Sequence, residues 1–124
     1  SNMRDALEQY LQSLDKVYQL PVQLALPGHR KGNISIAGRI DEIKEHHRNR
    51  LQEILDIVKT QPHMTAFEIA PHLTWSMRGK KWNEFPPTQK WFAMGETLAH
   101  IEYLVHHGRL AKEERNGVFL YALA

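Results

Sequence analysis

The residue best placed for chemistry is His29, at the end of the tight turn Leu26-Pro27-Gly28-His29. A neutral imidazole is the commonest metal ligand among side chains, and a rigid turn at the end of a strand suits one. On the residues alone, a solvent-exposed loop histidine is the favoured interpretation, and a metal ligand is the alternative. The sequence therefore predicts either a metal ligand or a plain loop residue at this position.

A second candidate is the segment 74–87, in which aromatic and cationic side chains are mixed. Such rings can stack on bases while the cations neutralise phosphates. The favoured interpretation, however, is that the rings fasten the segment to the domain while the charges stay in water, and nucleic-acid contact is the alternative. A connection between two helices is usually a few residues long, so the greater length of this segment indicates a structural or functional role. The predicted nucleic-acid or substrate contacts are Trp75, Arg78, Lys80, Lys81 and Trp82.

Histidines and arginines also cluster in the stretch 46–50. His47 falls within a stripe of apolar residues at helical spacing, which predicts a core or interface histidine with a satisfied ring nitrogen. His46, Arg48 and Arg50 flank that stripe. They are interpreted as a solvated helix flank, with a basic patch as the alternative.

Composition narrows the function classes. The chain has 124 residues, no cysteine, and 16 basic against 14 acidic side chains, for a formal charge of +2. The missing cysteines exclude disulfides, thiolate metal sites and cysteine nucleophiles. The charge is too balanced to indicate nucleic-acid binding by itself. No apolar run approaches the length needed to span a bilayer and no signal peptide opens the chain, so we expect a cytoplasmic protein without membrane partners.

The N-terminal half of the sequence predicts three elements. Ser1-Asn2 before Met3 is interpreted as the remnant of a purification tag. Apolar residues at helical spacing predict an amphipathic helix over 4–19, and the short apolar run 22–26 predicts a buried strand. A long helix then runs from a cap at Ser35 to about Thr60.

The remaining residues predict a compact helical core with a hairpin. Thr65 and Glu68 have the spacing of a capping box, and Pro71 should shorten the helix that follows. A longer helix from Thr88 carries its apolar stripe through Trp91, Met94, Leu98, Ile101 and Val105 and ends at Gly108. Asn116-Gly117 predicts a type I′ hairpin. The fold class is therefore mainly α with a small β-hairpin, arranged as a winged helix-turn-helix.

The face of the last helix opposite this stripe does not suit a DNA groove. A groove-reading helix presents arginine, lysine, asparagine or glutamine there. This face carries Glu96 and His100, and Glu96 repels phosphate. We therefore expect it to pack against protein, and sequence-specific DNA binding is disfavoured.

Taken in order, these motifs resemble the C-terminal part of metallo-β-lactamase-fold hydrolases that carry a winged-helix domain. The Pro-Gly-His turn, His47-Arg48, the Thr65-x-x-Glu68 box and Glu96-Thr97-x-Ala99-His100 ending at Gly108 carry the resemblance. It covers nearly the whole chain. It implies two parts: residues 1–34, the helix-strand end of an αββα catalytic domain, and residues 35–124, the winged helix.

The resemblance also implies a role for one residue. In the family, the histidine of the Pro-Gly-His turn is a ligand of a dinuclear, usually zinc, centre, and that role carries over to His29. Glycine usually follows this histidine, where Arg30 stands here. The family's His-x-His-x-Asp-His ligand cluster is absent, and a two-metal centre needs most of its ligands. We therefore expect no catalytic residues and no bound cofactor in this chain alone, and zinc or another divalent metal in a complete parent enzyme.

Three hypotheses for the function remain. The first is an accessory C-terminal region of a metal-dependent hydrolase, which packs on the catalytic domain and shapes substrate access. The second is an RNA- or DNA-binding winged-helix module. The third is a homodimer in which a second copy covers the apolar residues of the segment 7–26. The chain itself is either a piece of a longer hydrolase or a shortened product beginning at Met3.

Overall fold

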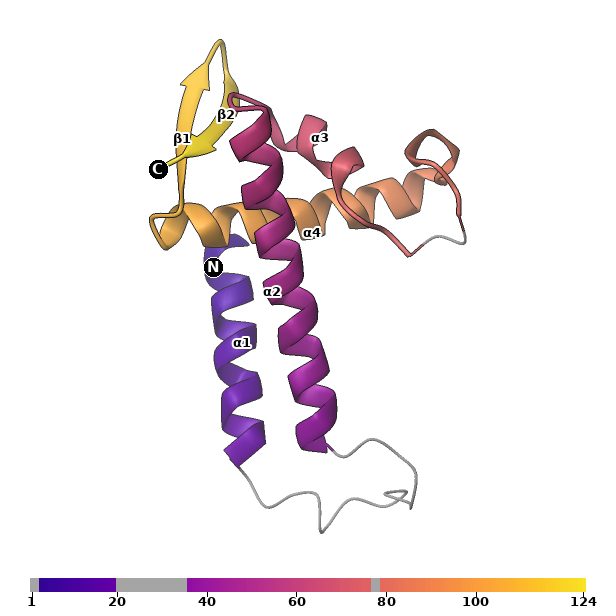
Figure 1. The fold of residues 1–124 in the computed structure, drawn as a ribbon, viewed down its shortest axis with the longest axis vertical. Helices are drawn as coiled ribbons and strands as arrows, with labels where there is room; N and C mark the ends of the chain where they lie inside the picture. The colour runs from indigo at the N-terminus through magenta and orange to yellow at the C-terminus, as the bar shows by residue number, and fades with distance from the viewer. Residues whose placement is uncertain (1–2, 20–35, 77–78) are drawn as a thin grey trace.

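The computed structural model describes residues 3–19, 36–76 and 79–124 (Figure 1). Within them the chain forms four α-helices and a two-stranded antiparallel sheet. The mainly helical fold with a small hairpin is as predicted. The elements are α1 (Met3–Gln19), α2 (Ile36–Thr60), α3 (Ala66–Ile69), α4 (Pro87–His106), β1 (Leu110–Arg115) and β2 (Val118–Leu123).

Two long helices form the body of the molecule. Figure 1 shows α1 and α2 lying side by side, with α4 crossing them and the hairpin and α3 beyond the crossing. The C-terminal part of α4 contacts α1, whereas the described residues between α3 and α4 lie beside its N-terminal part (Figure 1). The two ends of α4 therefore have different neighbours.

Helix α2 buries the apolar stripe that its spacing predicts. Ile40, Ile54 and Val58 face inward, and His47 is half-buried among them. The interpretation of Arg50 as a solvated flank residue is wrong, because only 5% of Arg50 is exposed. It follows His47 by three residues and precedes Ile54 by four, which places it on the inward face.

The short helix α3 begins at the predicted capping box and ends before Pro71. The Thr65 side chain accepts a hydrogen bond from the Glu68 amide, and the Glu68 carboxylate accepts one from the Thr65 amide. These two bonds confirm the capping box. After Ile69 the chain continues as one 3-10 turn, Ala70–His72, which contains Pro71. Proline lacks the amide that a longer helix needs, so the predicted shortening is also confirmed.

Helix α4 ends near Gly108, which has a φ of 72° as a C-terminal glycine requires. Its predicted inward stripe is partly wrong. Ile101 is fully buried, but Trp91 is 75% exposed and Leu98 is only partly buried. Because α4 contacts α1 and α2 as well as α3 and β1, it is covered on more than one side. The residues that it buries are Ala93, Thr97, His100, Ile101 and Leu104.

The hairpin has the register that a two-residue turn dictates. Arg115 pairs with Val118, and both turn residues have positive φ, 52° at Asn116 and 78° at Gly117. That combination defines the predicted type I′ turn. On the other side of β2, the Tyr121 amide donates to the Met64 carbonyl at 3.0 Å, so β2 is partly paired along both edges.

One hydrophobic core joins α2, α3, α4 and the hairpin. Leu7 of α1 is also buried, so its apolar surface is already covered within this chain. The predicted strand 22–26, the cap at Ser35 and His29 lie outside the described residues. No helix in the described part of the chain is long and apolar enough to cross a bilayer. The residues of the core are Ile54, Leu55, Val58, Met64, Ala66, Ile69, Leu73, Ile101, Leu104, Leu110 and Tyr121.

Candidate functional site

A buried arginine lies where α2 crosses α4. Arg50 Nη1 donates to Glu96 Oε2 at 2.6 Å, and Nη2 donates to the Thr74 carbonyl at 2.8 Å. The guanidinium also lies over the Trp75 ring, 4.1 Å from its centroid. A planar guanidinium can bind a carboxylate, a carbonyl and a ring face together. Arg50 thus joins α2, α4 and the start of the segment 74–86.

Within the described part of the chain, the Nε atom of the Arg50 guanidinium lacks a hydrogen bond, although it is buried. The Glu53 carboxylate is 3.9 Å away, which is within ion-pair range but too long for a hydrogen bond. Glu53 instead accepts from the Thr74 hydroxyl at 2.6 Å. Glu53 and Arg50 therefore both bind the chain at Thr74, and Glu96 binds Arg50.

Two histidines extend this polar group toward α1. His100 Nδ1 lies 2.7 Å from the Glu96 carbonyl, which can only accept, so Nδ1 carries the proton. His100 Nε2 lies 2.8 Å from His47 Nδ1. In a neutral His100 the Nε2 atom is an acceptor, so His47 must donate. The two bonds together assign the tautomer of His100 and the donor of His47.

Burial keeps this pair neutral. His100 is 1% exposed, and its burial lowers its pKa to about 4. Burial, and then the charge of His46, lower the pKa of His47 as well. The rings stack with centroids 5.0 Å apart, and Tyr10 of α1 meets His47 edge-on at 5.7 Å. The pair is therefore a structural contact between α1, α2 and α4, as predicted for His47.

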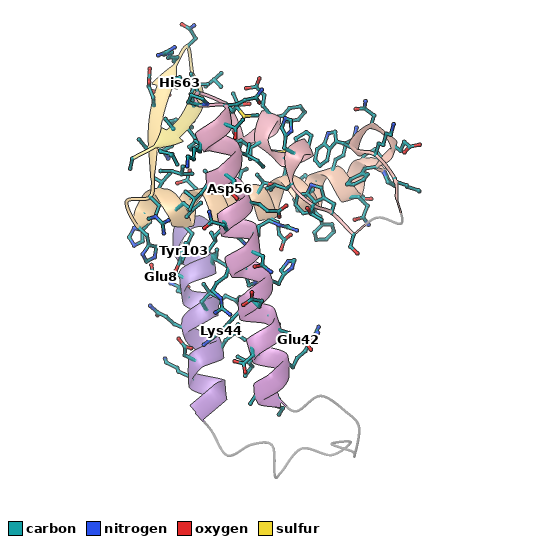
Figure 2. The ribbon with its side chains drawn as sticks, in the orientation of Figure 1. Glu8, Glu42, Lys44, Asp56, His63 and Tyr103 are labelled. Carbon is teal, nitrogen blue, oxygen red and sulfur yellow. The ribbon has the colours of Figure 1, made fainter. Side chains whose placement is uncertain are left out.

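Polar contacts also join α1 to the C-terminal end of α4. The Glu8 carboxylate lies 3.2 Å from His106 Nε2 and 3.5 Å from His107 Nε2. Figure 2 shows Glu8 beside Tyr103 at this junction, and Lys44 between α1 and α2. Lys44 pairs there with Asp15. Helix α1 is thus held by Leu7, by its charges and by the ring of Tyr10.

A cavity opens at the other end of α4, beside the segment 74–86. Its volume is about 340 Å³. One wall is fixed, because Trp75 Nε1 donates to the Ala70 carbonyl at 2.8 Å while Arg50 holds the ring. Phe92, by contrast, is 65% exposed at the rim. The residues that line the cavity are Trp75, Ser76, Phe85, Gln89, Phe92, Ala93 and Glu96.

The structure separates the predicted contact residues. Trp75 lines the cavity, whereas Lys80, Lys81 and Trp82 do not. The two lysines are exposed, and the Trp82 ring packs on Phe85 with centroids 5.4 Å apart. Arg78 lies outside the described residues. The nucleic-acid or substrate contact of these residues stays a prediction.

No metal-binding group can be assembled within the ranges that the structure describes. No three histidines or carboxylates there are placed to hold an ion together. His29 lies in the segment 20–35, outside those ranges. The described residues thus do not by themselves fit the implied metal centre.

Sequence reasoning misses Arg50 and Glu96 as partners. It places Arg50 on a solvated flank, and it considers Glu96 only as a residue that repels phosphate. The spacing His47, Arg50, Ile54 could have shown that Arg50 shares the inward face of α2. A buried arginine needs a carboxylate, which makes Glu96 of the next long helix a natural candidate.

Comparisons with known proteins give a consistent result. Residues 51–124 match the family described as "Metallo-beta-lactamase-like, C-terminal domain". The structure is similar to that of a beta-lactamase domain protein from Burkholderia ambifaria, with a TM-score of 0.74 and 33% identity over 95% of this chain. It is also similar to a metallo-beta-lactamase family protein from Thermus thermophilus, with a TM-score of 0.67 and 29% identity over 95% of this chain. The chain spans 33% of the length of each of these two proteins. No protein of curated function matches the chain.

Proposed function

Because this chain belongs to the family of metallo-beta-lactamase-like C-terminal domains, we propose that it is the accessory C-terminal region of a metal-dependent hydrolase. It packs on the catalytic domain, shapes the access of substrate and does no chemistry alone. In this proposal, α1 is the last helix of the catalytic domain, and residues 35–124 form a winged helix-turn-helix. The complete hydrolase holds zinc or another divalent metal, with His29 as one ligand.

The observation that carries the proposal is the seating of α1 on α2 and α4. Leu7 is 6% exposed, Tyr10 meets His47, and Glu8 lies between His106 and His107. Apolar burial and charge contacts along one helix give a fixed orientation rather than a loose tether. If α1 ends the catalytic domain, these contacts hold the accessory region in a set position beside the cleft.

The test compares the longer polypeptide that carries this chain with a version that ends at residue 34. Both are assayed for bound metal, thermal unfolding and hydrolysis of substrates of increasing size. We expect the shortened version to unfold at a lower temperature, because the face of α1 around Leu7 becomes exposed. We also expect its kcat/KM to change by different factors for small and large substrates. Equal kcat/KM ratios and equal unfolding temperatures would refute the accessory role.

Point variants separate packing from metal binding. Leu7→Ala should lower the unfolding temperature, and Gln12→Ala, an exposed neighbour on α1, is the matched control. His29→Ala should lower the zinc content measured by elemental analysis without changing the packing of α1. Undiminished zinc in the His29 variant would remove the proposed ligand and leave the packing proposal intact.

Nucleic-acid binding is the second candidate function. The exposed Lys80 and Lys81 favour it, whereas the burial of Arg50 against Glu96 removes one cation from the surface. Binding of single-stranded RNA or duplex DNA should then weaken steeply with salt. A Lys80→Ala, Lys81→Ala double variant should reduce both the affinity and the salt slope. Absence of binding at low salt would exclude this function.

A further inference from the structure

The cavity beside Trp75 has the composition of a small-ligand site. Its aromatic walls are Trp75, Phe85 and Phe92, and the buried Ala93 also lines it. A volume of about 340 Å³ suits one small ring system. Aromatic side chains supply large contact areas and favour flat partners by stacking or edge contacts.

The Trp75 side chain is held in place by contacts within the protein, so this wall of the cavity is preformed. Its Nε1 atom bonds the Ala70 carbonyl and its ring carries the Arg50 guanidinium, so the side chain is held from two directions. Phe85 is 6% exposed and packs on Trp82. A preformed wall reduces the entropy that binding must overcome. Phe92 is the exposed side chain that can settle over an occupant.

The polar rim selects the type of ring. Glu96 Oε2 is bound to Arg50, while Oε1 has only His46 near it, at 4.0 Å, among the described residues. The Glu96 side chain is 42% exposed and lines the cavity, so Oε1 can accept a hydrogen bond from a ligand. Arg50 and Glu96 neutralise each other, so neither an anion nor a strong cation is favoured.

We propose that this cavity binds a small uncharged molecule with a flat ring that carries an N–H or O–H donor at its edge. The ring lies between Trp75 and Phe92, and the donor bonds Glu96 Oε1. Ser76 and Gln89 are on the same rim and can accept or donate to further polar edges. The site goes beyond the accessory role, and its test needs no catalytic domain.

The experiment uses the isotopically labelled 124-residue chain and two ring probes of the same shape. Indole carries an N–H donor, and benzofuran has an oxygen in its place. We expect indole to shift the amide signals of Ser76, Gln89 and Phe92 with a Kd in roughly the millimolar range. Benzofuran should bind about fivefold to tenfold more weakly, because it lacks the hydrogen bond to Glu96.

Adjacent exposed aromatic residues supply a matched pair of variants. Phe92 lines the cavity, whereas Trp91 is 75% exposed and does not line it. Phe92→Ala should weaken indole binding about tenfold, and Trp91→Ala should leave it within about twofold. Equal binding of indole and benzofuran would overturn the role of Glu96. No shift at about 10 mM indole, or equal losses in the two variants, would overturn the site itself.

Discussion

The two ends of α4 are put to different uses. Its C-terminal half is enclosed by α1, α2 and the hairpin, and it buries His100, Ile101 and Leu104. Its N-terminal half carries Trp91 and Phe92 in solvent beside an open cavity. The C-terminal half of α4 thus packs in the core, and the N-terminal half lines the proposed binding site.

The difference shows how this small chain separates stability from recognition. Substitutions in the enclosed half should change the free energy of unfolding, whereas those in the open half should change binding. Arg50 and Glu96 lie at the boundary between the halves, since they join the core to the Trp75 wall. A substitution in the open half that lowers the free energy of unfolding, or one in the enclosed half that changes only binding, would contradict this division.

The largest effect is expected at the centre of the enclosed half. Ile101 is fully buried in the core, so Ile101→Ala should lower the free energy of unfolding by about 2–5 kcal/mol. Urea unfolding followed by circular dichroism measures this change. The control is Trp91→Ala, which should stay within about 0.5 kcal/mol because its ring is exposed. Similar losses of unfolding free energy in the two variants would contradict the proposed difference between the two halves of α4.

Acid should weaken the enclosed half through His100. Its pKa is about 4 in the folded chain, below the ordinary value of 6.5, because of burial. The unfolded chain therefore takes up this proton first, and stability should fall as pH falls from about 6.5 to about 4, by at most about 1.4 kcal/mol per pH unit. Glu96, His47 and Arg50 also act on the pKa of this ring, and His46 acts on the pKa of the neighbouring His47.

The control for this pH dependence is a histidine elsewhere in the fold. His100→Gln should flatten the decline between pH 6.5 and about 4, whereas His72→Gln, at an exposed position, should leave it unchanged. Chemical unfolding at several pH values gives the two slopes. An unchanged slope in the His100 variant would assign the acid sensitivity to other groups.

Loss of the boundary arginine should have an intermediate effect. Arg50→Ala leaves the Thr74 carbonyl without its donor, and Glu96 without its closest cation. Because Glu96 is partly exposed, water can solvate its charge, and we expect a loss of about 1–3 kcal/mol. Trp75 fluorescence should change with it. Arg50→Lys should restore little, since an ammonium cannot reproduce the fork and the ring contact; full recovery would contradict this geometry.

Leu98 tests the face of α4 directly. It is partly buried at the edge of the core, so Leu98→Ala should cost about 1–2 kcal/mol, less than Ile101→Ala. Thermal or urea unfolding of both variants under the same conditions gives the comparison. A loss at Leu98 as large as that at Ile101 would restore the stripe that the sequence predicts.

The smallest effect is expected where α1 meets the end of α4. Glu8→Gln removes the charge between His106 and His107, whose side chains are 41% and 38% exposed. Where these histidines are protonated, such pairs contribute roughly 0.2–1 kcal/mol and are screened by salt, so the measurement is made at mildly acidic pH. The wild-type advantage should therefore shrink between about 0.1 M and about 1 M salt. A salt-independent loss would mean that Glu8 acts by packing.

The order and limits of the elements could be predicted because their signals are local. The Thr65–Glu68 box, Pro71 and Asn116-Gly117 act on neighbouring backbone, so short stretches of sequence contain the whole cause. Helix α2 could also be predicted, because its apolar residues form a long stripe at helical spacing. The mainly helical fold followed from these parts.

The inward face of α4 and the role of Arg50 could not be found in the same way. Apolar residues on α4 occur on several sides, and only packed neighbours decide which are buried. The partner of Arg50 is 46 residues away, so no local pattern joins them. Contacts of that range depend on the crossing of two helices, which the sequence does not state directly.

The pairing of β2 with Met64 bears on how the protein behaves at high concentration. Because Tyr121 of β2 is bridged to Met64 as well as paired with β1, β2 is covered in part along its second edge, and β1 forms the other outer edge of the sheet. That edge carries Lys112, Glu113, Glu114 and Arg115 in succession. Charged side chains resist the addition of a foreign strand, because each would have to lose its hydration. The charges on β1 therefore disfavour pairing of this edge with a strand of another molecule.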